Sequence, residues 1–179
     1  MPRQEDSRSG IGALRPLPHS KNLRLHRLSD APATFFVTKS LQPKKPVLTS
    51  QLRAIISDAF VFAVQRERIY LRAFVVMPDH WHALLATRDP WTLPKFMHTF
   101  MSYIGGQTYG ATTTAKTRWQ DGYYETHVTT AKQFHFISDY ILANPVKKGL
   151  VDSPDQWDAS SLRLPGIIAD PWPYLLDNE

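Results

Sequence analysis

Apolar residues recur along this chain at two different spacings, and each spacing predicts one type of element. Two stretches carry an apolar residue at every third or fourth position, which predicts amphipathic helices over 50–65 and 93–104. Polar residues that can cap a helix stand at their starts, Thr49 or Ser50 for the first helix and Thr92 for the second. Each of these helices should therefore present one apolar face to a core.

Four shorter stretches are rich in β-branched and aromatic residues, which predicts strands. They lie at 33–40, 69–77, 80–87 and 125–128. Only a tight Pro-Asp turn separates the middle two, so we expect the second of them to return beside the first.

Helix-breaking residues mark the expected ends of the later helices. A glycine pair at 105–106 should end the second helix, and Pro145 should end a third helix over 131–144. The resulting order of elements is β, α, β, β, α, short β, α. This order predicts an α+β fold, an antiparallel sheet with helices packed on one face, related to the ferredoxin-like split βαβ.

Composition narrows the class of protein. The chain has 179 residues, of which 42% are hydrophobic, enough for one domain with a core. It has no cysteine, which excludes a disulfide framework, a thiolate metal site and a cysteine nucleophile. The net charge of +5 suits a polyanionic partner such as nucleic acid.

The same composition predicts how the chain is divided. We expect a flexible basic arm over 1–30, one domain over 31–152 and a tail over 153–179 that packs on the domain. The chain contains neither a run of about 18 apolar residues nor an apolar leader, so we expect a cytoplasmic protein with no membrane partner.

Two histidines stand one residue apart in the third predicted strand. Because side chains alternate along a strand, His80 and His82 should point to one face and Trp81 to the other. Two neighbouring imidazoles can bind one divalent cation. The same spacing also arises by chance on strands that bind nothing. Three other histidines compete as ligands, namely His98, His127 and His135.

The third predicted helix carries a tyrosine and an asparagine beside its apolar face. Tyr140 and Asn144 are four positions apart, so they should lie about 40° from each other around the helix. If this helix covers the face that carries the two histidines, the phenol and the amide oxygen approach the same ion. The alternative is a tyrosine that only packs and an asparagine that caps the helix before Pro145.

Several segments resemble, in the same order, the HUH nucleases, named for histidine, hydrophobic residue, histidine. MPDHWHALL resembles their metal-binding motif, specifically that of the single-tyrosine transposases of bacterial insertion sequences and the REP-associated tyrosine transposases. TFFVTKSL is similar to the family's first strand, RWQDGYYETHV to its tryptophan-glutamine segment and DYILANPVKKGLV to its tyrosine helix and exit. The resemblance covers residues 33–151, about two thirds of the chain.

This resemblance implies a metal-dependent endonuclease and strand transferase, a transposase with the HUH nuclease fold. Tyr140 corresponds to the nucleophile, and His80, His82 and Asn144 correspond to the metal ligands. The implied ion is Mg²⁺, with Mn²⁺ as a substitute because it accepts imidazole more readily. The product of the tyrosine's attack would be a covalent 5′-phosphotyrosine. The alternative from another class is a catalytically silent DNA-binding or regulatory module of the same fold.

The implied partner is single-stranded DNA or the foot of a hairpin, at palindromic repeats of the REP type. Basic side chains expected to hold the DNA backbone are Lys147, Lys148, Lys44, Lys45, Lys116 and Arg118. The first two directly follow the tyrosine helix and are favoured. Tyr123 and Tyr124 are candidates for base stacking. We expect association with the nucleoid, as either a monomer or a homodimer.

Overall fold

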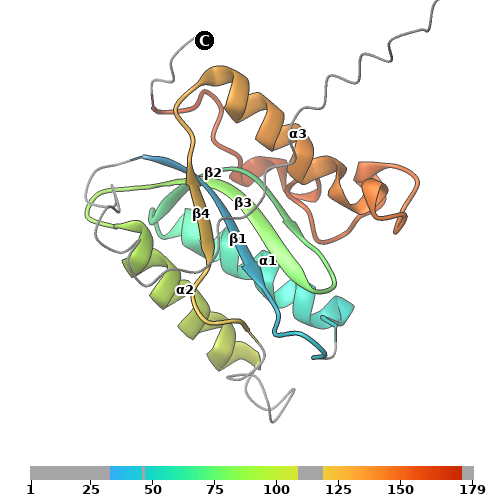
Figure 1. Cartoon of the computed structure of the whole chain (residues 1–179). Coiled ribbons are helices and arrows are strands. Elements are labelled where there is room, and N and C mark those ends of the chain that lie inside the picture. Colours follow the sequence, from blue (N-terminus) through green and yellow to red (C-terminus); the bar gives the residue numbers. More distant parts are fainter. Residues whose placement is uncertain (1–32, 46, 109–118, 175–179) are drawn as a thin grey trace, which may run out of the picture.

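The computed structural model describes residues 33–45, 47–108 and 119–174. Within these ranges, four strands form one sheet, accompanied by three helices and three short 3₁₀ turns (Figure 1). In chain order the elements are β1 (Thr34–Ser40), α1 (Ser50–Gln65), β2 (Ile69–Val76), β3 (His80–Thr87), α2 (Leu93–Thr108), β4 (Tyr124–His127), α3 (Ala131–Lys147), η3 (Pro154–Gln156), η4 (Ser161–Arg163) and η5 (Pro165–Ile167). The expected arm over 1–30 lies outside the described residues.

The strands pair antiparallel in the order β2-β3-β1-β4, which places β3 and β1 at the centre of the sheet. The register of β1 with β3 sets Thr38 opposite His82 and Ser40 opposite His80. Residues directly opposite each other in an antiparallel pair share one face of the sheet. This register therefore decides which side chains of β1 lie beside the histidines.

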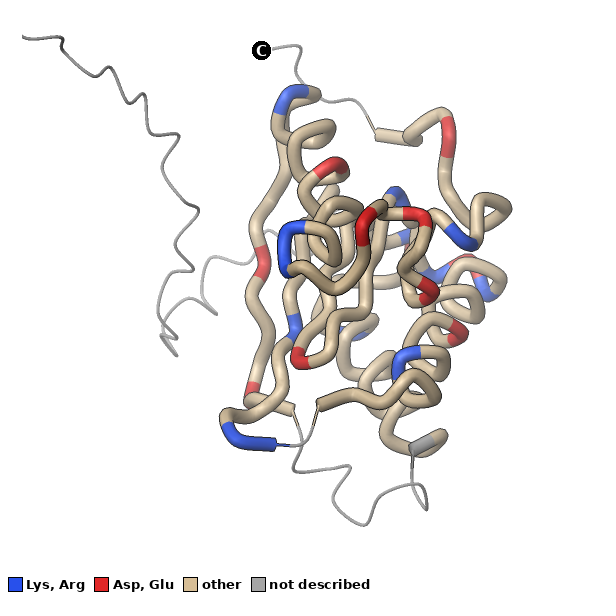
Figure 2. The backbone as a smooth tube through the Cα atoms, turned by 90° about the vertical axis from the view of Figure 1, so that its right-hand side faces the viewer, with Lys and Arg blue, Asp and Glu red and all other residues tan. Residues whose placement is uncertain are grey.

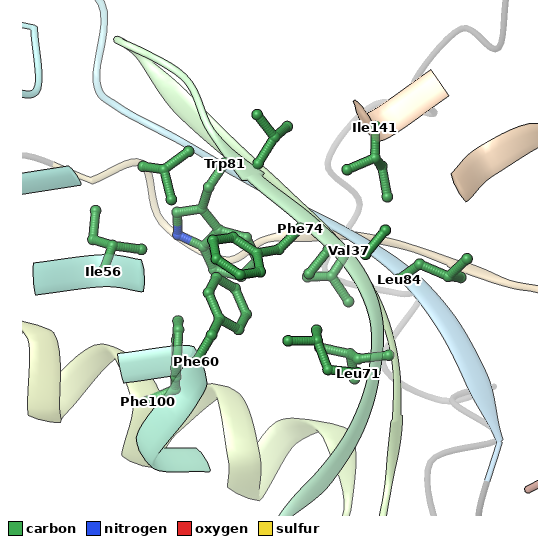
Figure 3. Close-up of a cluster of buried hydrophobic side chains, with 14 of the residues drawn as sticks. Val37, Ile56, Phe60, Leu71, Phe74, Trp81, Leu84, Phe100 and Ile141 are labelled. Atoms are coloured by element: carbon green, nitrogen blue, oxygen red, sulfur yellow. The ribbon is translucent and has the colours of Figure 1, made fainter. Parts of the chain in front are cut away.

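Helices cover both faces of the sheet. Trp81 of β3 packs against Phe60 of α1 and Phe100 of α2, with ring centroids 5.4 and 5.6 Å away. Ile141 of α3 lies across the sheet from this aromatic cluster (Figure 3). The α+β class and the antiparallel sheet are confirmed. Helices α1 and α2 lie on one face of the sheet, as expected for all three helices. Helix α3 instead packs on the opposite face.

The sequence of β2 and β3 gives the physical reason for this second cover. Almost every residue of these two strands is buried, whichever way its side chain points. A strand that is apolar on both sides needs a packing layer on both sides. In the alternating pattern of a one-sided sheet, every second residue would instead be exposed.

The helix starts follow the sequence, but two helix ends do not. Thr49 caps α1, because its hydroxyl oxygen accepts the backbone N–H of Leu52 at 3.3 Å. The glycine pair at 105–106 is the predicted end of the second helix. Helix α2 instead continues through this pair to Thr108. A glycine costs a helix only about 1 kcal/mol, and the buried Ile104 holds this last part of α2 on the core.

Helix α3 also runs past its predicted end, through Pro145 to Lys147. A proline in a helix loses one backbone hydrogen bond, but its fixed φ is compatible with helical geometry. Pro145 is buried, so packing offsets part of that loss. The helix closes where the Lys148 N–H donates to the carbonyl of Asn144 at 3.1 Å.

Residues 153–174 pack along the outer edge of β2 and on the faces beside it. The Val76 N–H donates to the carbonyl of Ala159 at 2.8 Å, and the Phe74 N–H donates to the Ser161 hydroxyl at 3.1 Å. The indole N–H of Trp157 donates to the Val76 carbonyl at 3.0 Å. An edge strand with free backbone groups is a site for unwanted pairing, and these contacts cover it.

Within the described ranges, no helix combines the length and the apolar character that crossing a membrane requires.

Candidate metal and tyrosine site

The two histidines of the sequence motif open strand β3 and point to the face covered by α3. Their Nε2 atoms lie 3.1 Å apart. His82 is buried and His80 is partly exposed at the end of the strand. Trp81 between them points into the opposite layer, as the alternation of a strand requires.

Each imidazole is held at its other nitrogen by a different neighbour. His80 Nδ1 lies 2.6 Å from an Asp79 carboxylate oxygen, and His82 Nδ1 lies 2.7 Å from the Thr38 hydroxyl. Hydrogen bonds at Nδ1 fix the ring orientation and leave Nε2 facing the neighbouring ring. The two Nε2 atoms therefore converge on one point.

The histidine motif alone did not identify either of these neighbours. Asp79 stands directly before His80 in the motif, and that adjacency is a signal that could have identified it. Thr38 lies 44 positions from His82, and only the register between β1 and β3 brings the two together.

Electrostatics favour the neutral form of His82. Burial, and next the proximity of His80, lower the pKa of His82 from 6.5 to about 3, while Asp79 acts in the opposite direction. A neutral imidazole has one nitrogen lone pair available. His82 therefore has the protonation state that metal ligation needs.

Tyr140 projects from α3 toward this histidine pair. Its ring centroid lies 5.6 Å from that of His82 and 6.2 Å from that of Phe36 on β1. Lys147, about two turns further along the same helix, places its Nζ 5.0 Å from the centroid of the Tyr140 ring. A phenol, a cation and an imidazole pair are thus gathered in one place.

Asn144 lies one helical turn beyond Tyr140 and is buried, with 3% of its surface exposed. Its Nδ2 atom has no hydrogen-bond partner in the described part of the chain. An unpaired buried amide nitrogen is costly, on the order of 1–3 kcal/mol, so it requires an explanation. The oxygen and nitrogen of an amide are assigned by their hydrogen bonds, so either atom can occupy this unpaired position.

The other histidines lie elsewhere. His98 is exposed on α2, which covers the opposite face, and His135 is exposed on α3 beside the Phe134 ring. His127 of β4 pairs with Phe35, whose side chain points away from the α3 face. Among the described residues, no three His, Asp or Glu side chains gather as a metal-binding cluster.

The predicted DNA-binding cations fall into three groups. Lys147 and Lys148 are exposed at the end of α3. Lys44 and Lys45 are exposed in the segment that follows β1. That segment adjoins the histidine strand, because the Leu41 N–H donates to the Asp79 carbonyl at 2.7 Å. Both groups thus lie on segments adjoining the histidines or Tyr140. Lys116 and Arg118 lie outside the described residues. Figure 2 shows that the basic positions are spread over several elements of the chain.

The two tyrosines proposed for base stacking are half-buried. Tyr124 begins β4 and pairs with Thr38, so its side chain lies on the same face as His82. Tyr123 directly precedes it and packs against the core cluster.

The strand that carries the two histidines faces a tyrosine on the helix that covers it. This is the arrangement that the resemblance to the single-tyrosine transposases implies. The model of the family described as "Transposase IS200 like" matches residues 35–144. This match spans more than half of the chain, and the chain therefore belongs to the IS200-like transposase family.

Individual proteins are also similar to this chain. A REP-associated tyrosine transposase of Escherichia coli (strain K12) is 28% identical over 131 residues, which cover 72% of this chain and 75% of the relative. A solved REP-associated tyrosine transposase bound to a REP hairpin shares the fold, with a TM-score of 0.59 and 22% identity over 82% of this chain and 88% of that one. A putative transposase from Deinococcus radiodurans matches with a TM-score of 0.47 and 17% identity, over 62% of this chain and 89% of that one.

Proposed function

We propose that this chain is a metal-dependent endonuclease and strand transferase that cuts single-stranded or hairpin DNA with Tyr140 as its nucleophile. The observation that carries the proposal is the position of the Tyr140 ring, whose centroid lies 5.6 Å from that of His82. The Nε2 atom of His82 in turn faces the Nε2 atom of His80. Membership of a transposase family supports DNA as the substrate.

The residues present fit a divalent cation. Ligands at right angles around an ion with bonds of about 2.1 Å lie about 3.0 Å apart, and the two Nε2 atoms are 3.1 Å apart. The unpaired, buried amide of Asn144 would supply an oxygen ligand once its amide is turned. We therefore assign His80, His82 and Asn144 as the residues that hold Mg²⁺ or Mn²⁺. When bound, such a cation withdraws charge from the oxygens of a phosphodiester.

The proposed reaction transfers a phosphodiester to Tyr140. The phenolic oxygen forms a bond to phosphorus and its proton passes to solvent. The bond from phosphorus to O3′ breaks, and the departing oxygen takes a proton to become a 3′-hydroxyl. The 5′ side remains linked to Tyr140, so a 3′-hydroxyl can later attack the same phosphorus and release the tyrosine.

The side chains around Tyr140 suit this substrate. Lys147 places a positive charge beside the ring, where the negative phosphodiester must approach. Phe36 packs edge-on against the same ring and restricts its orientation. A solved relative is bound to a REP hairpin, which supports a hairpin as the form of DNA that this chain recognises.

The decisive experiment is cleavage of a hairpin oligonucleotide with a single-stranded flank, carrying a label on its 3′ side. With Mg²⁺ or Mn²⁺, the wild-type chain should acquire the label in a band that survives denaturing electrophoresis. Tyr140→Phe should abolish this band, because the ring remains but the attacking oxygen is gone. Tyr103→Phe is the matched control, since Tyr103 stacks on Phe62 in the opposite layer. A labelled band that persists in Tyr140→Phe would refute the assignment of the nucleophile.

Two further variants separate binding from chemistry. His80→Ala with His82→Ala should abolish the covalent band but leave hairpin affinity mostly unchanged. Lys147→Gln with Lys148→Gln should weaken binding and reduce the slope of log affinity against log salt by about 0.7 for each lost contact to a single strand. A wild-type chain that binds the hairpin with steep salt dependence but never forms an adduct would instead be a silent DNA-binding module.

A further inference from the structure

The two histidines differ in the chemistry of their partners at Nδ1. His80 meets the carboxylate of Asp79 at 2.6 Å, and His82 meets the hydroxyl of Thr38 at 2.7 Å. An ionised carboxylate can only accept a hydrogen bond, whereas a hydroxyl can donate or accept. His80 is therefore restricted to one neutral tautomer, and His82 is not.

These contacts determine which atom donates in each hydrogen bond of the metal-free site. With Asp79 ionised and His80 neutral, the proton of His80 is on Nδ1, so its Nε2 carries a lone pair. The hydrogen between the two Nε2 atoms, 3.1 Å apart, must then belong to His82. His82 Nδ1 is left with a lone pair, which accepts the Thr38 hydroxyl hydrogen.

Binding a cation between the two rings requires the opposite arrangement at His82. A ligating imidazole offers a lone pair, so both Nε2 atoms must be free of hydrogen. His80 already meets this condition. The proton of His82 has to leave Nε2 and reside on Nδ1, and Thr38 must then accept rather than donate. The imidazole keeps one proton in both states, and the hydroxyl keeps its own hydrogen.

We propose that Thr38 is a positioning residue that allows His82 to change tautomer when a divalent cation binds, while Asp79 keeps His80 permanently in the ligating tautomer. This inference rests on the metal role proposed above for the two histidines. A side chain that only donates or only accepts at this position would stabilise one of the two states at the expense of the other.

The test measures the His82 tautomer and metal affinity rather than DNA cleavage. Nitrogen NMR of histidine-labelled chain at about pH 8, above the ordinary histidine pKa, should report hydrogen on His82 Nε2 without metal and on Nδ1 with Mg²⁺. Mn²⁺ affinity, measured by electron paramagnetic resonance, should fall on the order of 10–100-fold in Thr38→Val, as for other outer-shell partners of metal ligands.

Two further variants provide the controls. Thr38→Ser keeps a hydroxyl and should restore both the tautomer change and the Mn²⁺ affinity. Thr126→Val makes the same substitution at an exposed position of β4 on the same face and should behave as wild type. Circular dichroism of each variant shows whether it folds, and the serine variant keeps the test valid if valine perturbs β1.

Three results would overturn the inference, and they are distinguishable. If the wild-type chain binds Mn²⁺ and Thr38→Val binds it equally well, Thr38 has no positioning role, although the metal site stands. If the wild-type chain binds Mn²⁺ but His82 keeps one tautomer throughout, the proposed tautomer change does not occur. If the wild-type chain binds no Mn²⁺, the proposed metal role fails and the tautomer change fails with it.

Discussion

The two faces of strand β3 show how one strand serves a core and a site at once. Toward α1 and α2, Trp81 enters a cluster of aromatic rings that includes Phe60 and Phe74, 4.7 Å apart between centroids (Figure 3). Toward α3, the next residue, His82, meets Thr38 and the ring of Tyr140. The apolar layer gains stability from burial, and that stability allows polar groups to remain buried one peptide unit away.

The largest expected effect of a substitution on stability lies in the apolar layer. Trp81→Ala should lower the free energy of unfolding by about 3–5 kcal/mol, because a fully buried ring is removed from a packed cluster. Trp81→Phe should cost much less, since the indole Nε1 has no hydrogen-bond partner in the described part of the chain. Urea unfolding followed by circular dichroism measures both. Equal losses for alanine and phenylalanine would show that the indole nitrogen contributes more than ring packing does.

The next effect concerns the polar face and depends on pH. Because the pKa of His82 is lowered to about 3, the unfolded metal-free chain binds a proton below pH 6.5 that the folded chain does not bind until about pH 3. The stability from neutral His82 is therefore fully present above pH 6.5 and is lost as pH falls, by up to about 1.4 kcal/mol per pH unit.

Urea unfolding of the metal-free chain between about pH 6.5 and 4.5 tests this slope. His82→Gln should show a shallower decline than wild type, because glutamine does not titrate. His98→Gln, at an exposed position on α2, should decline as wild type does. If His82→Gln and wild type have equal slopes, His82 does not remain neutral in the folded chain.

The smallest expected effect is at Asn144. Its Nδ2 has no partner in the described part of the chain, so Asn144→Ala should change the free energy of unfolding by no more than about 1 kcal/mol and can raise it. The same variant should bind Mn²⁺ more weakly than wild type. A loss of several kcal/mol of stability without any loss of Mn²⁺ binding would identify Asn144 as a structural residue.

Sequence periodicity predicted the elements better than it predicted their ends. The apolar spacing of 50–65 and the Thr49 cap correspond directly to α1, because both depend on neighbours within one or two turns. The glycine pair at 105–106 and Pro145 were expected to end helices and do not. Their local costs are a few kcal/mol at most, and packing of residues such as Ile104 against the core offsets them.

The sequence by itself determined that Trp81 points to one face of the strand and that His80 and His82 point to the other. It also determined that Tyr140 and Asn144 lie on the same side of their helix. Both follow from backbone geometry. Only the tertiary structure decided that α3 covers the histidine face, and that Thr38 lies opposite His82. Strand register and the choice of face result from how distant segments share one core, and no local pattern encodes that.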